Sequence, residues 1–309
     1  MKELRHIRVL SDGRPGHENQ SVGLALALAR RTGATHEVVK LDSASGLLAR
    51  MRRAAALGAG DVGRPELVIS AGHRTHLPLW WAARRLGARS VVIMRPSLPE
   101  GLFDLALVPR HDVRSGDTDT KRRVLTRGAL NRVPEALPAK EARGLVLIGG
   151  PSKHHGWDGA ALTDQIVRVI ATEPELAWTV ADSRRTPEGF LAGLALPAGV
   201  ERVPHAATGP GWLAGELARA SVVWATEDSV SMVHEAATAG AATGVLPAPR
   251  TGGGRVVRAV DELVKAGLAT RYPEKPAAQA ERFHEAGRCA ELILARWFAA
   301  GEHTGKILT

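Results

Sequence analysis

Short apolar runs alternate with helix-forming segments along most of this chain, and no other feature constrains the fold as strongly. In the first part of the chain, the apolar runs that are typical of buried strands lie at 8–10, 37–41, 66–70, 90–94 and 105–108. Segments with apolar residues at helical spacing lie between them, at 19–31, 49–57 and 77–86. Alternating strands and helices form a parallel sheet that is covered by helices on both faces, so this part predicts an α/β domain.

The alternation stops at residues 110–141, which are rich in charged residues, turn formers and proline, and we interpret this stretch as an interdomain linker. It then restarts, with expected strands at 144–148, 177–181, 200–203, 221–225 and 243–246, the last of these being the final strand. Helices are expected at 159–172, 211–220 and 230–239, followed by a long helical region over 276–300. The chain therefore predicts two Rossmann-like domains with parallel sheets, at residues 1–134 and 135–309.

Composition narrows the class of partner. Of the 309 residues, 41 are Lys or Arg and 32 are Asp or Glu, which gives a net charge of +9. A basic surplus favours anionic partners such as nucleotide phosphates or anionic lipid, although a solvated basic surface explains it equally well. The single cysteine, Cys289, excludes an intrachain disulfide and a cysteine-based metal site, and it lies in a helical apolar stretch where we expect a buried thiol.

No apolar run approaches the ~20 residues of a membrane span, and the amino terminus shows no signal-peptide core. We therefore expect a cytoplasmic protein, with attachment to a membrane surface left open. Trp80 and Trp81 precede Arg84 and Arg85 in one expected helix. This pairing fits a membrane-surface patch, since Trp favours the interface and Arg favours anionic headgroups. Burial of one or both tryptophans in the core is the alternative.

The loop after the first strand is a candidate site. Gly13 and Gly16 permit tight turns, and the helix that follows presents free N–H groups that attract anions. His17 is the candidate proton acceptor, with Asp12 and Glu18 as the next choices. An ordinary strand-to-helix turn with an exposed histidine is the alternative.

Two loops of the second domain carry cationic and small polar residues at the ends of expected strands. They contribute the candidate donor-binding residues Gly149, Gly150, Ser152 and Lys153, then Ser183, Arg184 and Arg185. The spacing is not that of a P-loop. Since both loops follow parallel strands, they share one sheet edge, and their cations are expected to converge on a diphosphate. Solvated basic residues are the alternative.

A third loop, which is acidic, follows the expected strand 221–225. It supplies Glu227, Asp228 and Ser229, and we expect Ser229 or Ser231 to cap the next helix. The helix adds the candidate donor-binding residues Ser231, Met232 and Glu235. Glu235 is placed to meet a sugar hydroxyl, with a solvent-facing or packing role as the alternative. Ligands bind at the carboxyl ends of such strands, so we expect a substrate to be held between the two domains.

Several stretches together resemble one known family. They are 12–20, 70–72, 103–105, 108–112, 149–153, 183–187 and 226–232, in this order within about residues 7–250. They look like the elongated-mitochondria, or mitochondrial fission, family of plants and many proteobacteria, whose members are regarded as candidate glycosyltransferases of GT-B architecture. The resemblance implies two Rossmann-like domains facing each other across a cleft, with a C-terminal helix that packs back toward the first.

A more distant likeness concerns the glycine loop and the run Ser231 to Gly240, which are similar to the N-acetylglucosaminyl transferase that forms lipid II. It implies that Glu235 holds the donor ribose and that the donor is a nucleotide-linked sugar, with UDP favoured. The acceptor is left open, including a lipid-linked one, because Arg14-Pro15 replaces part of the glycine loop.

The resemblance implies no metal, since cations and helix termini neutralise the leaving diphosphate in such enzymes. It also implies no cofactor and no nucleic-acid partner. Two alternatives remain open: a nucleotide-sugar epimerase or hydrolase on the same frame, and a non-catalytic adaptor that binds membrane or protein partners.

Overall fold

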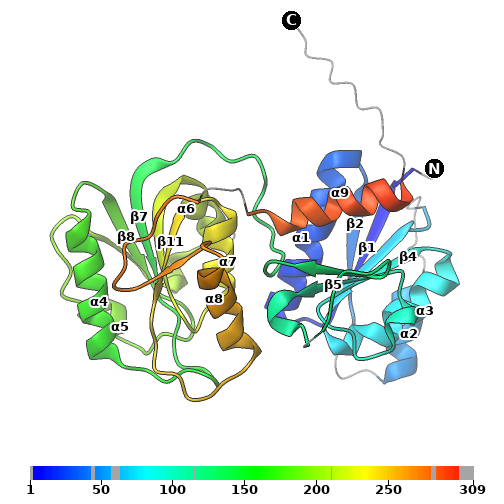
Figure 1. Cartoon of the computed structure of the whole chain (residues 1–309), viewed down its shortest axis with the longest axis horizontal. Helices are drawn as coiled ribbons and strands as arrows, with labels where there is room; N and C mark the ends of the chain where they lie inside the picture. Colours follow the sequence, from blue (N-terminus) through cyan, green and yellow to red (C-terminus); the bar gives the residue numbers. More distant parts are fainter. Residues whose placement is uncertain are drawn as a thin grey trace, which may run out of the picture. The chain divides into compact units, whose positions relative to one another are not determined.

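The computed structural model describes residues 3–42, 46–56, 63–114, 116–209, 211–279 and 283–298. These residues form two compact units. The first unit contains the residues up to Arg132 and those from His284 onward, and the second spans Val133–Phe283. Each unit has a six-stranded sheet with helices against it (Figure 1). The predicted α/β class with two parallel sheets is confirmed.

The first unit contains a parallel sheet with the strand order β2-β1-β3-β4-β5-β6. Its strands are β1 (His6–Ser11), β2 (Thr35–Lys40), β3 (Leu67–Ala71), β4 (Arg89–Ile93), β5 (Leu105–Pro109) and β6 (Arg123–Thr126). Its helices are α1 (Pro15–Thr32), α2 (Leu47–Ala55), α3 (His76–Leu86) and α9 (Glu285–Trp297), with short 3-10 turns at His73–Thr75, Glu100–Leu102 and Arg110–Asp112.

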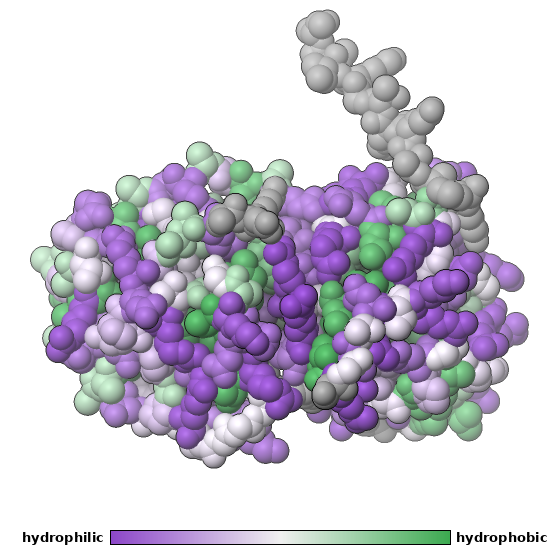
Figure 2. Space-filling model, in the orientation of Figure 1, coloured by the Kyte–Doolittle hydropathy of each residue, from purple (hydrophilic) through white to green (hydrophobic). Residues whose placement is uncertain are grey.

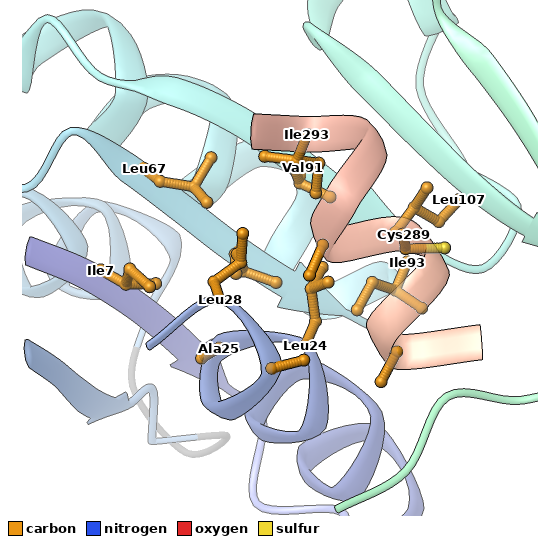
Figure 3. Packing of buried hydrophobic residues seen from close by; sticks show 14 of the residues in the cluster. Ile7, Leu24, Ala25, Leu28, Leu67, Val91, Ile93, Leu107, Cys289 and Ile293 are labelled. Carbon is orange, nitrogen blue, oxygen red and sulfur yellow. The ribbon is translucent and has the colours of Figure 1, made fainter. Parts of the chain in front are cut away.

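Helices α1 and α9 cover one face of this sheet. Leu24 and Leu28 of α1 pack with Cys289 and Ile293 of α9 against strand residues such as Ile93 (Figure 3). Cys289 is fully buried, and burial raises the pKa of its thiol to about 12, so the thiol is protonated at neutral pH. The last helix therefore packs within the first unit, as the resemblance implied. Helices α2 and α3 contribute to the core on the other face.

The second unit contains a parallel sheet with the strand order β12-β11-β10-β7-β8-β9. Its strands are β7 (Glu141–Leu147), β8 (Ala177–Ala181), β9 (Glu201–Val203), β10 (Ala220–Thr226), β11 (Ala242–Leu246) and β12 (Thr270–Arg271). Its helices are α4 (Gly159–Thr172), α5 (Phe190–Gly193), α6 (Trp212–Arg219), α7 (Val230–Thr238) and α8 (Arg255–Lys265), with a 3-10 turn at His205–Ala207. Helices α4 and α5 share one core, and α6, α7 and α8 share another.

Several expected boundaries are wrong. The linker interpretation fails at β6, an edge strand whose alternating burial and flanking charges hid it among polar residues. The strand at 243–246 is not the last, because α8 and the two-residue β12 follow it. Helix α1 begins at Pro15, whose fixed φ suits the first turn of a helix, so Gly16, His17 and Glu18 are helical residues.

The last helical region is shorter than expected, since α9 begins at Glu285. Within the expected 276–300, residues 280–282 and 299–300 lie outside the described residues, as does Leu57 at the end of the second expected helix. The small helix α5 was not predicted. Neither tryptophan of α3 is fully buried, because Trp80 is half-buried and Trp81 is 37% exposed.

Surface and core are well separated in each unit. Hydrophilic residues cover most of the face that Figure 2 draws. Among the described residues, no helix has both the length and the apolar character needed to cross a membrane.

Candidate functional site

In the second unit, four loops leave the carboxyl edge of the sheet after β7, β8, β10 and β11. The parallel strands are neighbours in the order β11-β10-β7-β8, so these loops lie beside one another. They carry most of the donor-binding residues that the sequence predicts. The carboxyl edge is where open α/β sheets bind ligands.

Two glycines allow these loops to approach closely. The N–H of Gly149 donates to Thr226 Oγ1 at 2.7 Å, and the N–H of Gly150 donates to Asp228 Oδ2 at 3.0 Å. A Cβ atom on Gly149 would overlap the Asp228 carboxylate, and one on Gly150 would overlap the backbone carbonyl of Arg185. The loop after β7 therefore lies close to the loops after β10 and β8, and a side chain at Gly150 would require the backbone at Arg185 to move.

Hydroxyl groups join the loop after β8 to the same structure. Ser183 Oγ donates to the Gly149 carbonyl at 3.1 Å, and Thr186 Oγ1 donates to the Ile148 carbonyl at 3.1 Å. Ser152 Oγ accepts from the N–H of His155 at 3.1 Å. The hydroxyls of Ser152 and Ser183 thus hold the loop backbones in place.

The predicted cations differ in their surroundings. Arg185 pairs with the buried carboxylate of Asp228 at 2.7 Å and donates to the Gly150 carbonyl at 3.0 Å. Arg184 and Lys153 are exposed, and their side chains have no ion pair within the described part of the chain. Arg185 is therefore a fixed charge, whereas Arg184 and Lys153 have their donors available for an anion.

Glu227 belongs to a network that the sequence did not predict. Its buried carboxylate accepts from Arg250 Nε at 3.0 Å and from Arg271 Nη1 at 2.7 Å. Both arginines also bond Asp261 Oδ1, at 2.6 Å and 2.8 Å. Burial alone would raise the pKa of Glu227, but the two arginines outweigh it and hold the pKa below its usual value. The carboxylate stays ionised and braces the loop.

Helix α7 begins directly after this acidic loop. Ser229 lies at its N-cap position but its side chain makes no capping hydrogen bond, which corrects the expectation of a serine cap. Helix α4, by contrast, is capped by Asp158, which accepts from the N–H of Ala161 at 3.0 Å. The first N–H groups of α7 thus lack the serine cap, and such groups bind anions.

The remaining predicted residues of α7 lie at its first turns. Ser231 is exposed, Met232 is half-buried against the core, and Glu235 is half-buried one turn further along the helix. Glu235 is the sixth residue of α7, so it lies between one and two turns from the helix start.

His155 is a residue of this edge that the sequence reasoning missed. It is fully buried in the loop after β7, and neither ring nitrogen has a hydrogen-bond partner in the described structure. Burial lowers the pKa of His155, and Arg250 adds to this, while Glu227 and Asp228 oppose it. The ring is neutral near pH 7. The adjacent His154-His155 pair was a visible signal, but histidines in loops are common.

In the first unit, the predicted catalytic residues lie at the end of β1 and the start of α1. His17 Nδ1 is 2.9 Å from Asp12 Oδ2, and the Asp12 side chain is almost fully buried. Gly72, at φ 90°, faces this ring, since a Cβ there would overlap the His17 imidazole. Asp12 and the backbone of Gly72 therefore fix the His17 ring, with Nδ1 bound to a carboxylate.

Glu18 is directed elsewhere. It accepts from Ser11 Oγ at 2.7 Å and from Arg132 Nη2 at 3.0 Å, and the hydrogen bond from Ser11 is the main reason that its pKa is lowered. Gly13 and Gly16 have open space where a side chain would project. Of the three candidate acid–base residues, Asp12 and His17 are thus paired, and Glu18 is tied to Ser11 and Arg132.

The chain is similar to known proteins over most of its length. The profile of the family described as mitochondrial fission ELM1 matches residues 15–297. The uncharacterised protein RP120 of Rickettsia prowazekii (strain Madrid E) is 23% identical over 93% of this chain and 97% of that protein.

Two solved structures are similar across almost the whole chain. A protein of Listeria monocytogenes assigned as a UDP-N-acetylglucosamine 2-epimerase is 13% identical, with a TM-score of 0.57 over 94% of this chain and 95% of its own. The glycotransferase of kitacinnamycin is 18% identical, with a TM-score of 0.50 over 96% of this chain and all of its own. At these identities the likeness concerns the fold, and it confirms the expected GT-B architecture.

Proposed function

The chain belongs to the mitochondrial fission ELM1 family, and we propose that it is a glycosyltransferase that uses a nucleoside diphosphate sugar, with UDP as the favoured nucleotide. One observation carries the proposal: Arg184, Lys153 and the N-terminus of α7 lie on loops of one sheet edge, with donors available for a diphosphate. The GT-B fold supports it, as does the UDP-sugar in the name of the similar Listeria protein.

In this proposal the second unit binds the donor. The diphosphate accepts hydrogen bonds from the first N–H groups of α7 and from Arg184 and Lys153, which neutralise the charge that develops as it leaves. Glu235 receives the ribose hydroxyls, as the likeness to the lipid II-forming transferase implied. Glu227 and Asp228 keep the loops in position through their arginines rather than by touching the donor.

In this proposal the first unit accepts the proton of the attacking hydroxyl. The Asp12 carboxylate holds a proton on Nδ1 of His17 and leaves Nε2 as the acceptor for the proton of an attacking hydroxyl. Asp12 also stabilises the imidazolium that forms. The same proposal includes a lipid-linked molecule as a candidate acceptor of the sugar.

The deciding experiment incubates the protein with UDP-sugars and measures released UDP, with and without extracted lipid. Release that depends on an acceptor supports a transferase. Calorimetry with UDP, GDP and CDP tests the donor site separately, and no binding of any of them at millimolar concentration would refute it.

An epimerase or hydrolase is the second candidate, favoured by the similar Listeria structure. Such an enzyme would change or hydrolyse the sugar nucleotide with no acceptor present, which NMR of the sugar would reveal. The carboxylates at the second edge, Glu227 and Asp228, are already bound to arginines, which weakens this alternative. An adaptor would need neither nucleotide binding nor turnover.

Attachment to an anionic membrane surface is a finer part of the proposal. Leu47 and Leu48 of α2 are 41% and 71% exposed, and Trp81 of α3 is 37% exposed, while α2 and α3 pack against each other. Exposed arginines accompany them on both helices. This combination of apolar and cationic side chains suits the interface of an anionic membrane. Co-sedimentation with phosphatidylglycerol vesicles tests it, with phosphatidylcholine vesicles as the control.

A further inference from the structure

A separate pocket lies at the opposite edge of the first sheet from Asp12 and His17. Its walls include Arg89, the first residue of β4, as well as Asp104 and Arg122, which directly precede β5 and β6. Because the strands are parallel, these residues lie at the amino-terminal edge, whereas Asp12 follows the carboxyl end of β1. Nothing in the proposed sugar transfer uses this edge.

The pocket is strongly cationic. Arg84, Arg89, Lys121 and Arg122 line a cavity of about 460 Å³ together with one carboxylate, that of Asp104. Asp104 is already occupied, because it accepts from Arg89 at 2.8 Å and from the N–H and hydroxyl of Ser90 at 2.9 Å each.

The other three cations have no such partner. Across the described ranges, Arg84, Lys121 and Arg122 have no ion pair. Elsewhere in the unit, arginines such as Arg95 and Arg123 are paired with carboxylates. Three unpaired positive charges that share one hollow attract a multiply charged anion.

Two indole rings help to hold the arginines. The guanidinium of Arg84 lies 5.2 Å from the ring centre of Trp80, and that of Arg89 lies 5.5 Å from the ring centre of Trp297. Arg122 is held by a hydrogen bond from Nη1 to the Gly101 carbonyl. Cation–π contacts and this hydrogen bond restrict the side chains before a ligand arrives, which reduces the entropy that binding costs.

We propose that this pocket binds the phosphate group of a small organic phosphate ester. The planar guanidinium groups of Arg84 and Arg122 suit phosphate oxygens, and Lys121 adds a third charge. The volume falls in the usual range for small-molecule sites, about 300–1,000 Å³, so the organic part of the ester fits beside the indoles. A free metabolite and a lipid headgroup present this same group.

The test is calorimetry with inorganic phosphate and glycerol 3-phosphate, and co-sedimentation with vesicles of phosphatidylglycerol or phosphatidylcholine. We expect Arg84→Ala and Arg122→Ala each to weaken the interaction at least tenfold, and Lys121→Ala to weaken it in the same direction. Arg30→Ala is the control, because Arg30 is an exposed arginine near the end of α1, does not line the pocket and lies outside α2 and α3. UDP binding should be unchanged in all four variants.

If the pocket variants lose binding to glycerol 3-phosphate but keep binding to phosphatidylglycerol, the ligand is a soluble ester. If they lose binding to phosphatidylglycerol but keep binding to glycerol 3-phosphate, the ligand is a lipid headgroup. The proposal is overturned if neither glycerol 3-phosphate nor phosphatidylglycerol binds, or if Arg30→Ala weakens binding as much as Arg84→Ala, which would indicate a general effect of surface charge.

Discussion

Both units have a six-stranded parallel sheet, but the carboxyl edges of the two sheets carry different electrostatic arrangements. In the first unit, the buried carboxylate of Asp12 faces the imidazole of His17, with 2.9 Å between Asp12 Oδ2 and His17 Nδ1. In the second unit, Glu227 and Asp228 face Arg250, Arg271 and Arg185, which stay charged throughout the physiological range. The two edges thus differ in the partner of their buried carboxylates, which is a histidine at the first edge and arginines at the second.

The difference is also visible in how rigid the two arrangements are. Glu227 is held by two arginines that are themselves joined through Asp261, so each charge has at least two partners. The His17 ring has one carboxylate partner, Asp12, which it meets through Nδ1, and we propose that Nε2 serves the substrate. A fixed network suits a diphosphate site, because preorganised charges need no rearrangement during the reaction.

Removing the imidazole is expected to have the largest effect. His17→Ala should lower sugar transfer by ~100- to 10,000-fold, the usual contribution of a general base, and leave UDP affinity nearly unchanged. Steady-state kinetics and calorimetry measure the two quantities. His36→Ala, a change of an exposed histidine on the edge strand β2, is the control and should keep full activity. Full activity in His17→Ala would mean that the base lies elsewhere.

Breaking the fixed charge network should act on stability instead. Glu227→Gln removes a buried charge from between Arg250 and Arg271, and we expect a loss of about 3 kcal/mol in the free energy of unfolding, the lower end of the range for such pairs because the arginines are partly solvated. Urea unfolding measures it. Glu262→Gln, a nearby glutamate on α8, is the control.

The same variant has a pH signature. The pKa of Glu227 is lowered in the folded chain, so its contribution is present above the unfolded pKa, near 4.3, and is lost as the pH falls through the folded value. The difference in stability between the wild-type chain and Glu227→Gln should therefore shrink as the pH falls below about 4. A difference that stays constant down to pH 2 would contradict the ion-pair explanation.

A smaller effect is expected for an unpaired cation of the second edge. Arg184→Ala should weaken UDP binding about tenfold, or ~1.4 kcal/mol, because it removes one charge-assisted contact to the diphosphate. Stability should not change, since Arg184 has no ion pair in the described structure. Arg168→Ala, which removes an exposed arginine of α4 that is paired with Asp164, is the control. Unchanged UDP affinity would remove Arg184 from the donor site.

The smallest effect is expected on removal of divalent metal. If arginine, lysine and helix N–H groups neutralise the diphosphate, a chelator should change UDP affinity by less than tenfold. Calorimetry with and without the chelator measures this. A larger loss would show that the second edge relies on a metal and not on its own cations.

Sequence reasoning recovered the elements whose signals are local. Helix α4 and strand β8 have the predicted bounds, because apolar spacing and the capping Asp158 are visible within a few residues. Strand β6 was missed, since an edge strand carries polar residues that interrupt the apolar pattern. Helix α8 was missed although its buried residues Val257, Val260 and Leu263 recur at helical spacing. Pro15 was assigned to a loop because glycine and proline favour turns as well as helix starts.

By itself, the sequence determined two parallel α/β sheets and the loops that follow their strands, because hydrophobic periodicity and glycine positions act over short distances. It also placed Asp12 and His17 at one strand-to-helix junction, although the structure has His17 within the first turn of α1. The partners of each charge were decided only by the tertiary structure. Glu227 meets Arg250 and Arg271 from 23 and 44 residues away, and Asp228, which follows β10, meets Arg185, which follows β8, although β7 lies between these strands. Such pairings depend on strand order and register, which no local pattern encodes.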